Sequence, residues 1–366
     1  MVCSQCTKRV RTACTSGYDQ STMKLRAGLI GYGLAGRVFH APLLQAAGIA
    51  VAQVASSRAE EVQRDFPEAK VVADPMAVAT SADVDLVVVA APNDTHHALG
   101  MAALRAGRAV VIDKPFARTV AEAEELIATA HAQKKLLSVF HNRRWDSDFL
   151  TLKDCIMRGD LGEVVSYQCR FDRYRLEVQD RWREQPALGG GIFFDLGPHL
   201  IDQALQLFGW PEWIFADLNL QRPGTQVDDD FRLVMGKGRL RMVLGATILA
   251  AQPEPKFVVH GTGGSFVKPG MDVQEDQLKA GLRPGDAGFG VEAATHAASV
   301  TTVRNGQAHT QIVPTLPGQY VAYYAGIRAA LESGQPEPVQ AESALQTMRI
   351  LELALESQRT GRKITL

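Results

Sequence analysis

The sequence contains no long apolar run and almost no net charge. No uninterrupted apolar stretch approaches the roughly 18 residues that a helix needs to cross a bilayer. The formal net charge is -1 over 366 residues, whereas a protein that binds nucleic acid or an anionic membrane surface usually carries a clear basic excess. We therefore expect neither nucleic acid nor a membrane as the main partner.

Cysteine is scarce and unevenly placed. The five cysteines are Cys3, Cys6, Cys14, Cys155 and Cys169. A secreted disulfide scaffold would distribute them differently, so this usage predicts a reducing compartment, the cytoplasm. The Cys3-x-x-Cys6 pair has no nearby histidine and falls short of the four ligands of a structural zinc site, so no metal is predicted. We expect residues 1–22 to be either a disordered extension or a non-native one, in which case translation starts at Met23.

Short apolar runs alternate with helical spacing over residues 23–145. With 46% hydrophobic residues, the chain can fill one or two globular cores. The runs at 85–91 and 109–112 are nearly continuous, as in strands that are covered on both faces. Strands that alternate with helices predict a Rossmann domain, a doubly wound parallel sheet that binds ligands at the carboxyl ends of its strands.

A glycine-rich turn follows the first predicted strand. The motif G-x-G-x-x-G spans residues 31–36, between an apolar run and a segment of helical spacing, and a second apolar run follows at 49–55. In this context Gly31 forms the tight turn, Gly33 admits a pyrophosphate, and Gly36 allows close packing of helix and strand. The helix N-terminus then favours the anion. The predicted cofactor contacts are Gly31, Gly33, Leu34, Ala35 and Gly36.

The second strand ends at Ser56-Ser57-Arg58, where NAD-binding folds place an acid for the ribose 2′-OH. Arg58 is placed to meet a 2′-phosphate instead, so NADP is predicted, with NAD as the other option. Ser57-x-x-Glu60 also matches a capping box for the following helix. Both interpretations are compatible, because a cap formed by Ser57 leaves Ser56 and Arg58 for the cofactor.

Polar residues follow three later strand ends, and in a parallel sheet these ends share one edge. Asn93, Lys114 and Asn142 should therefore line one crevice. The predicted cofactor contacts at these ends are Ala91, Pro92, Asn93, His96, Asp113 and Lys114.

Residues 146–366 have a different pattern, with several strands and few helices between them. The predicted strands are 164–171, 212–220, 231–235, 240–249 and 257–260. Residues 260–266 predict a hairpin, and residues 253–290 predict loops over one edge. Helices are expected at 148–157, 318–333 and 341–360. The fold class is thus a Rossmann domain followed by an open-faced, mostly antiparallel sheet flanked by helices.

A second glycine run, Gly189-Gly190-Gly191, leads into a predicted helix to about residue 208. Asp195, His199 and Asp202 stand at i, i+4 and i+7, so they share one helix face. Histidine suits proton transfer near neutral pH, and a carboxylate one turn away can orient it. An incidental surface pair is the structural alternative. A metal site has the same spacing, but a nearby lysine disfavours a cation.

Together these motifs resemble the glucose–fructose oxidoreductase/inositol dehydrogenase family. The motifs are the turn at 31–36, Pro92-Asn93-x-x-His96, Lys114-Pro115, and residues 189–202. The resemblance implies that Lys114, Asp195 and His199 are the catalytic group. Residues 141–146 and 180–184 look closest to bacterial NADP-dependent scyllo-inositol dehydrogenases. The substrate residues that we predict are Asn142, Arg144, Trp182 and Asp202. One departure is Asp113, where most members have glutamate.

The resemblance implies an NADP-dependent dehydrogenase that acts on a cyclic polyol or sugar. It also implies a homodimer or homotetramer formed through the C-terminal sheet. In the expected reaction His199, oriented by Asp195, takes the hydroxyl proton, and Lys114 stabilises alkoxide charge. Two alternatives remain: a glycosidase that uses NAD transiently, and a redox-inert NADP-binding regulator. Neither alternative consumes NADPH, so net turnover separates them from a dehydrogenase.

Overall fold

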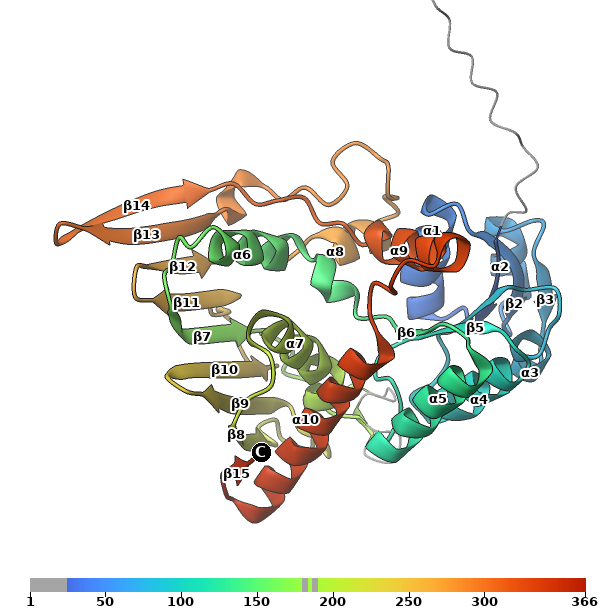
Figure 1. Ribbon diagram of the computed structural model, residues 1–366, viewed down its shortest axis with the longest axis horizontal. Coiled ribbons are helices and arrows are strands. Elements are labelled where there is room, and N and C mark those ends of the chain that lie inside the picture. Colours follow the sequence, from blue (N-terminus) through green and yellow to red (C-terminus); the bar gives the residue numbers. More distant parts are fainter. Residues whose placement is uncertain (1–24, 180–183, 186–189) are drawn as a thin grey trace, which may run out of the picture.

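The computed structural model describes residues 25–179, 184–185 and 190–366 (Figure 1). The expected extension at 1–22, its cysteines and Trp182 lie outside the described residues. Cys155 and Cys169 are buried free thiols. Among the described residues, no helix combines the length and the apolar character needed to cross a membrane.

The N-terminal half is a six-stranded sheet with the order β3-β2-β1-β4-β5-β6. All its neighbouring strands are parallel, which confirms the predicted doubly wound sheet. The strands are β1 Arg26–Ile30, β2 Ala50–Ala55, β3 Lys70–Val72, β4 Leu86–Val89, β5 Ala109–Ile112 and β6 Leu137–Val139. Every residue of β4 and β5 is buried, because helices cover both faces of the sheet.

The helices of this half are α1 Ala41–Ala46, α2 Ala59–Asp65, α3 Pro75–Ala79, α4 His96–Arg105 and α5 Val120–Gln133. Short turns of helix, η2 Asn93–Thr95 and η3 Asn142–Trp145, follow β4 and β6. The helix after the glycine turn begins as a π-helix, η1 Ala35–His40, which the sequence did not predict. The predicted Ser57 cap is wrong: α2 starts after Arg58 without a side-chain cap. The Ser56 hydroxyl instead accepts the backbone N–H of Arg58, at 3.0 Å.

The C-terminal half is a nine-stranded sheet with the order β14-β13-β12-β11-β7-β10-β9-β8-β15. Among the described strands of this sheet, β7 and β10 pair in parallel and the other neighbours pair antiparallel. The strands are β7 Val164–Arg170, β8 Trp213–Asn219, β9 Asp230–Lys237, β10 Leu240–Thr247, β11 Phe257–Gly261, β12 Gly264–Lys268, β13 Ala298–Arg304, β14 Gln307–Val313 and β15 Ile364–Thr365. The helices are α6 Ser147–Met157, α7 Ile192–Phe208, α8 Gln274–Lys279, α9 Val321–Ser333 and α10 Ala341–Thr360.

The five predicted strands and the hairpin at 260–266 are present. Four elements were missed: strand β15, the hairpin strands β13 and β14, and helix α8, which lies inside the segment expected to be loop. That hairpin turns at Asn305-Gly306, where both residues have positive φ, a turn signal that the sequence contains. Nearly all of β14 is exposed, so its residues show no apolar alternation that would mark a strand.

The contacts that join the two halves include a shared helix and a buried aromatic cluster. Helix α10 packs on α7 and β8 of the C-terminal half and also on α5 of the N-terminal half (Figure 1). A buried aromatic cluster forms the second contact, where the hydroxyl of Tyr324 lies 2.6 Å from Nδ1 of His40 and the hydroxyl of Tyr323 lies 2.9 Å from that of Ser138. The two halves therefore hold a fixed cleft between them.

Candidate active site

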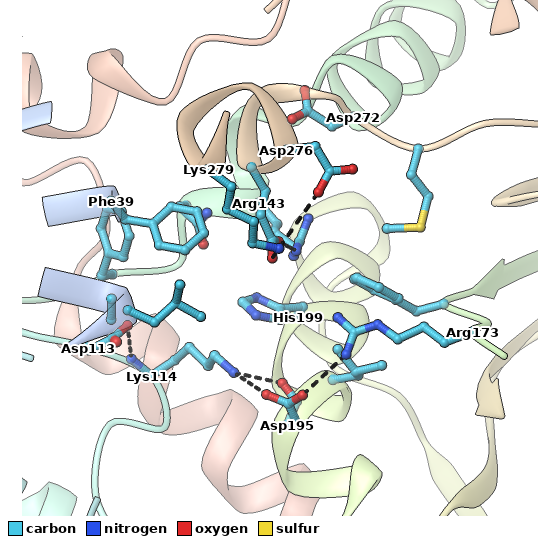
Figure 2. A pocket seen from close by; sticks show the side chains of 18 of the residues that line it. Phe39, Asp113, Lys114, Arg143, Arg173, Asp195, His199, Asp272, Asp276 and Lys279 are labelled. Carbon is cyan, nitrogen blue, oxygen red and sulfur yellow. Dashed lines mark hydrogen bonds and ion pairs between the residues drawn. The ribbon is translucent and has the colours of Figure 1, made fainter. Parts of the chain in front are cut away.

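A cleft of about 470 Å³ opens between the two halves of the chain. Residues after β5 and β6 line it from the N-terminal half, and α7, α8 and the segment after β7 line it from the C-terminal half (Figure 2). The lining residues used below are Leu34, Ala35, Asp113, Lys114, Asn142, Arg143, Phe171, Arg173, Asp195, His199, Glu275, Asp276 and Lys279.

The glycine turn has the shape that a dinucleotide pyrophosphate requires. Gly31 has a φ of +98°, which L side chains rarely adopt. A Cβ at Gly36 would clash with the carbonyl oxygen of Gly31, so only glycine allows the helix to start this close to β1. A Cβ at Gly33 would meet nothing within 4 Å, which leaves the backbone open to a ligand. Leu34 and Ala35 continue this surface into the cleft, so the turn fits the predicted cofactor.

Arg58 lies beyond the carboxyl end of β2. Its side chain is 51% exposed, and Nη1 lies 3.4 Å from Oε1 of Glu61. Such a loosely held guanidinium can turn to a ligand phosphate. Ser56 stands beside it with its hydroxyl oxygen accepting the N–H of Arg58, so its O–H remains able to donate.

His96, a predicted cofactor contact, is buried and does not line the cleft. Its Nδ1 lies 2.8 Å from the carbonyl oxygen of Pro115 and its Nε2 lies 3.0 Å from that of Ala91. The ring thus ties the turn after β4 to the segment after β5. In this position it holds Lys114-Pro115 in place. Ala91, Pro92 and Asn93, which the sequence places at the same sheet edge, are not among the residues that line the cleft.

Asp113 supports Lys114 from the other side. Its Oδ1 accepts the backbone N–H of Lys114 at 2.8 Å, and its Oδ2 lies 3.8 Å from Nε2 of His40. Burial opposes the charge of Asp113, but His40 and Lys114 outweigh it and hold the pKa of this carboxyl below its ordinary value. The carboxylate is therefore charged at neutral pH.

Lys114 reaches across the cleft to α7 (Figure 2). Its Nζ donates to the carbonyl oxygen of Asp195 at 2.7 Å and to Oδ1 of the same residue at 3.2 Å. Nη1 of Arg173 lies 3.7 Å from Oδ2. We expected Asp195 to orient His199 directly, but no hydrogen bond joins these two among the described residues. Asp195 instead forms ion pairs with the two cations Lys114 and Arg173.

His199 lies between these cations at the centre of the cleft (Figure 2). Its side chain is buried, and within the described part of the chain its Nδ1 has no hydrogen-bond partner. Burial lowers the pKa of His199 well below its ordinary value, and the charges of Lys114 and Arg143 lower it further. The imidazole is therefore neutral at neutral pH and can accept a proton.

Arg144 and Asp202, two predicted substrate residues, do not line the cleft. They form a buried bidentate pair with each other, with Nε to Oδ2 at 2.9 Å and Nη2 to Oδ1 at 2.6 Å, and Arg144 also donates to Ser343 on α10. On the helix face that carries Asp195, His199 and Asp202, both carboxylates are thus paired with cations, Asp195 with Lys114 and Asp202 with Arg144. This arrangement does not suit a metal. Arg144 and Asp202 instead join η3, α7 and α10.

We expect Asp202→Ala to destabilise the protein by about 3–5 kcal/mol, because it leaves the guanidinium of Arg144 buried without its partner. Chemical denaturation of both forms measures this loss. The matched control is the double variant Arg144→Met/Asp202→Leu, which removes both charges and should recover much of the stability. A single variant as stable as the wild type, with a raised KM, would restore the substrate role.

Asn142 lines the cleft as predicted, but several other lining residues were missed. Arg143 donates to Oε2 of Glu275 at 2.6 Å and to Asp146 at 3.2 Å, so it connects η3 to α8. Lys279 donates to Oε1 of Glu275 at 2.6 Å. Arg173 follows the end of β7, and this position resembles the other strand-end sites that the sequence identified. No sequence pattern places α8 opposite the glycine turn.

Comparison with known proteins agrees with this geometry. A family model described as "Oxidoreductase family, NAD-binding Rossmann fold" matches residues 25–141, and one described as "Oxidoreductase family, C-terminal alpha/beta domain" matches residues 153–366. The chain is 40% identical to scyllo-inositol 2-dehydrogenase (NADP(+)) IolW of Bacillus subtilis, over 93% of this chain and 96% of the relative. It is 45% identical to the uncharacterised oxidoreductase YdgJ of Escherichia coli, over 91% and 96%.

Solved structures show the same fold. The structure of the oxidoreductase YvaA of Bacillus subtilis superposes with a TM-score of 0.91 at 39% identity, covering 94% of this chain and 98% of the other. The oxidoreductase YPO2259 of Yersinia pestis has a TM-score of 0.90 at 47% identity, with 94% and 97% covered. With two family models along almost its whole described length, the chain belongs to the glucose–fructose oxidoreductase/inositol dehydrogenase family of oxidoreductases.

Proposed function

We propose that this protein is an NADP-dependent dehydrogenase that oxidises a secondary alcohol of a cyclic polyol or sugar, with a scyllo-inositol-type ring as substrate. The observation that carries the proposal is a buried, neutral His199 in the same cleft as Lys114 and the glycine turn. A relative named scyllo-inositol 2-dehydrogenase (NADP(+)), 40% identical over almost the whole chain, supports the substrate class and the cofactor.

The reaction requires a proton acceptor and a way to stabilise negative charge on oxygen. A bound nicotinamide would supply the acceptor for the hydride of the carbinol carbon. His199 accepts the proton of the hydroxyl, since its imidazole is neutral and faces the cleft. Lys114, held by Asp195, donates to the oxygen as it becomes negative. Residues 33–35 would hold the pyrophosphate.

A neutral, hydroxyl-rich ring suits the remaining lining residues. Asn142, Arg143 and Lys279 present donors, and Glu275 and Asp276 present acceptors. The cations are largely paired with the acids, as in the contacts of Glu275 with both Arg143 and Lys279. Each hydroxyl of a polyol both donates and accepts a hydrogen bond. A lining in which cations are paired with carboxylates offers both donors and acceptors, so it suits such a ring better than it suits an anion.

The decisive assay is NADP reduction, followed spectrophotometrically, across inositols and aldoses. Net formation of NADPH with a cyclic polyol is the expected result. A protein that binds NADP but reduces none of it would be a regulator. Glycoside cleavage without net NADPH would identify the glycosidase alternative. Either outcome would reject the proposal.

Arg58→Ala should raise the dissociation constant for NADP about ten- to a hundredfold, because a charge-assisted contact to the 2′-phosphate contributes roughly 1.5–3 kcal/mol. The dissociation constant for NAD should hardly change, since NAD lacks that phosphate. Glu61→Gln is a matched control, because it removes the partner of Arg58 and keeps the arginine. Tighter binding of NAD than of NADP by the wild type would contradict the predicted preference.

We also propose that the protein is a cytoplasmic homodimer or homotetramer, assembled through the sheet face that α7 and α10 leave uncovered. Helix α7 packs on β9 and β10, and helix α10 packs on β8. The exposed Phe215 of β8 is an apolar residue on this sheet. Light scattering of Phe215→Lys against the wild type tests the proposal, and an unchanged mass would contradict it.

A further inference from the structure

Three cations surround one aromatic ring in the wall of the cleft. Cζ of Arg143 and Cζ of Arg173 each lie 4.8 Å from the ring centroid of Phe171, and Nζ of Lys256 lies 5.1 Å from it. Phe171 lines the cleft together with His199. Arg143 and Arg173 contact carboxylates, on Glu275 and Asp195 respectively. Lys256 differs from both.

Lys256 is buried, and no oxygen atom of a described residue accepts a hydrogen bond from its ammonium. It is 2% exposed. Its contacts are the faces of Phe171 and Phe257, the latter at 5.2 Å. The neighbouring side chain of Cys169 offers only a thiol, which is a weak acceptor. A buried ammonium of this kind costs stability, so its presence calls for another explanation.

Lys268 provides the contrast, since it is the other buried lysine of the same hairpin. It stands opposite Phe257 in the pairing of β11 with β12. Its Nζ donates to Oε2 of Glu292 and to the carbonyl oxygen of His296, both at 2.6 Å. Two lysines with similar burial thus have opposite environments. Lys268 is satisfied as a structural residue should be, and Lys256 is not.

We propose that Lys256 is a positioning residue of the reaction, whose unpaired charge acts through Phe171 and His199 to keep the inner wall of the cleft electropositive. This inference rests on the proposed function, in which a hydroxyl oxygen in this cleft becomes negative. An ammonium without a carboxylate partner keeps its full field in a medium of low dielectric constant. The field both favours the neutral form of His199 and stabilises the alkoxide.

The surroundings of His199 allow this effect of Lys256. The titratable and charged groups that face it are Lys114 after β5, His141 and Arg143 at η3, Lys256 before β11, and Asp195 and Asp202 on its own helix. The two carboxylates are occupied by Lys114 and by Arg144. Burial, followed by the charges of Lys114, Arg143 and Lys256 among others, lowers the pKa of His199. Lys256 is the lysine of this set that forms no ion pair with a carboxylate of the described residues.

The test compares Lys256→Met with the wild type in melting temperature, in the pH dependence of kcat/KM, and in the titration of His199 by NMR. The melting temperature should stay the same or rise, because an unpaired buried charge is removed. The acidic limb of kcat/KM should move up by about half a pH unit to one unit, as the pKa of His199 rises. The NMR titration should move with it, with His199→Gln identifying the signal.

Lys268→Met is the matched control. It should lower the melting temperature by several degrees, because Glu292 is left buried without its partner, and it should leave the titration of His199 unchanged. If Lys256→Met behaves in this same way, Lys256 is structural and the proposal is overturned. Lys256→Gln gives the same titration test should the methionine variant fail to fold. A wild type that oxidises no polyol would refute the proposed function, and the NMR titration would still decide whether Lys256 acts on His199.

Discussion

His199→Ala should lower the turnover number about a hundred- to ten-thousandfold, which is the range that a lost general base costs. The structure gives the reason: His199 lies in the cleft, it is neutral, and its Nδ1 is bound by no described residue. Cofactor affinity should change little, because the glycine turn and Arg58 lie on the other half of the chain. Steady-state kinetics and NADP titration measure both quantities.

The fold has to be kept intact for this comparison. His199→Gln fills the space and donates or accepts a hydrogen bond, but it cannot act as a base, so it should be as slow as the alanine variant. His131→Ala is a control at an exposed histidine of α5, whose side chain is 70% exposed, and it should leave turnover unchanged. Near-normal turnover by His199→Gln at neutral pH would make His199 a structural residue.

The sequence predicted those parts of the molecule in which local pattern and burial agree. The apolar runs of β4 and β5 are buried throughout, and α10 occupies the predicted residues 341–360. Helix α5 begins after Thr119, whose hydroxyl oxygen accepts the N–H of Glu122 at 3.2 Å, a contact between residues three apart in the sequence. In each case the neighbours along the chain are enough to decide the structure.

The parts that failed depend on partners far away in the sequence. Asp202 shares a helix face with His199, but its partner Arg144 stands 58 residues earlier, and this pair removes both from the cleft. Arg143 and Arg144 are adjacent in sequence, so only the packed structure decides which one lines the cleft. Helix α8 is short and polar, and its place beside η1 comes from the tertiary fold alone. The catalytic roles of Lys114, Asp195 and His199 remain predictions.

The ion pair of Lys114 and Asp195 leads to two variants with opposite effects on the rate–pH profile. Both variants should have a lower turnover number. We expect a loss of about a hundred- to a thousandfold for Lys114→Met, because this is the cost of losing one donor to a developing oxyanion. The loss for Asp195→Asn should be smaller. Lys114→Met removes a positive charge that lowers the pKa of His199. That pKa should rise, so the acidic limb of kcat/KM moves to higher pH.

Asp195→Asn should move the same limb in the other direction. The asparagine can still accept from Nζ of Lys114, but the charges of Lys114 and Arg173 are then no longer offset near His199. The imidazolium is less favoured, the pKa of His199 falls, and the limb moves to lower pH.

The losses from the two variants should fall short of additive in free energy, because both residues act on one transition state. A direct hydrogen bond between Asp195 and His199 would predict a different result. In that case Asp195→Asn would also disturb the imidazole ring, whereas Lys114→Met would leave the hydrogen bond to the ring in place. Limbs that move in the same direction, or that do not move, would show that His199 is not the group whose titration limits the rate.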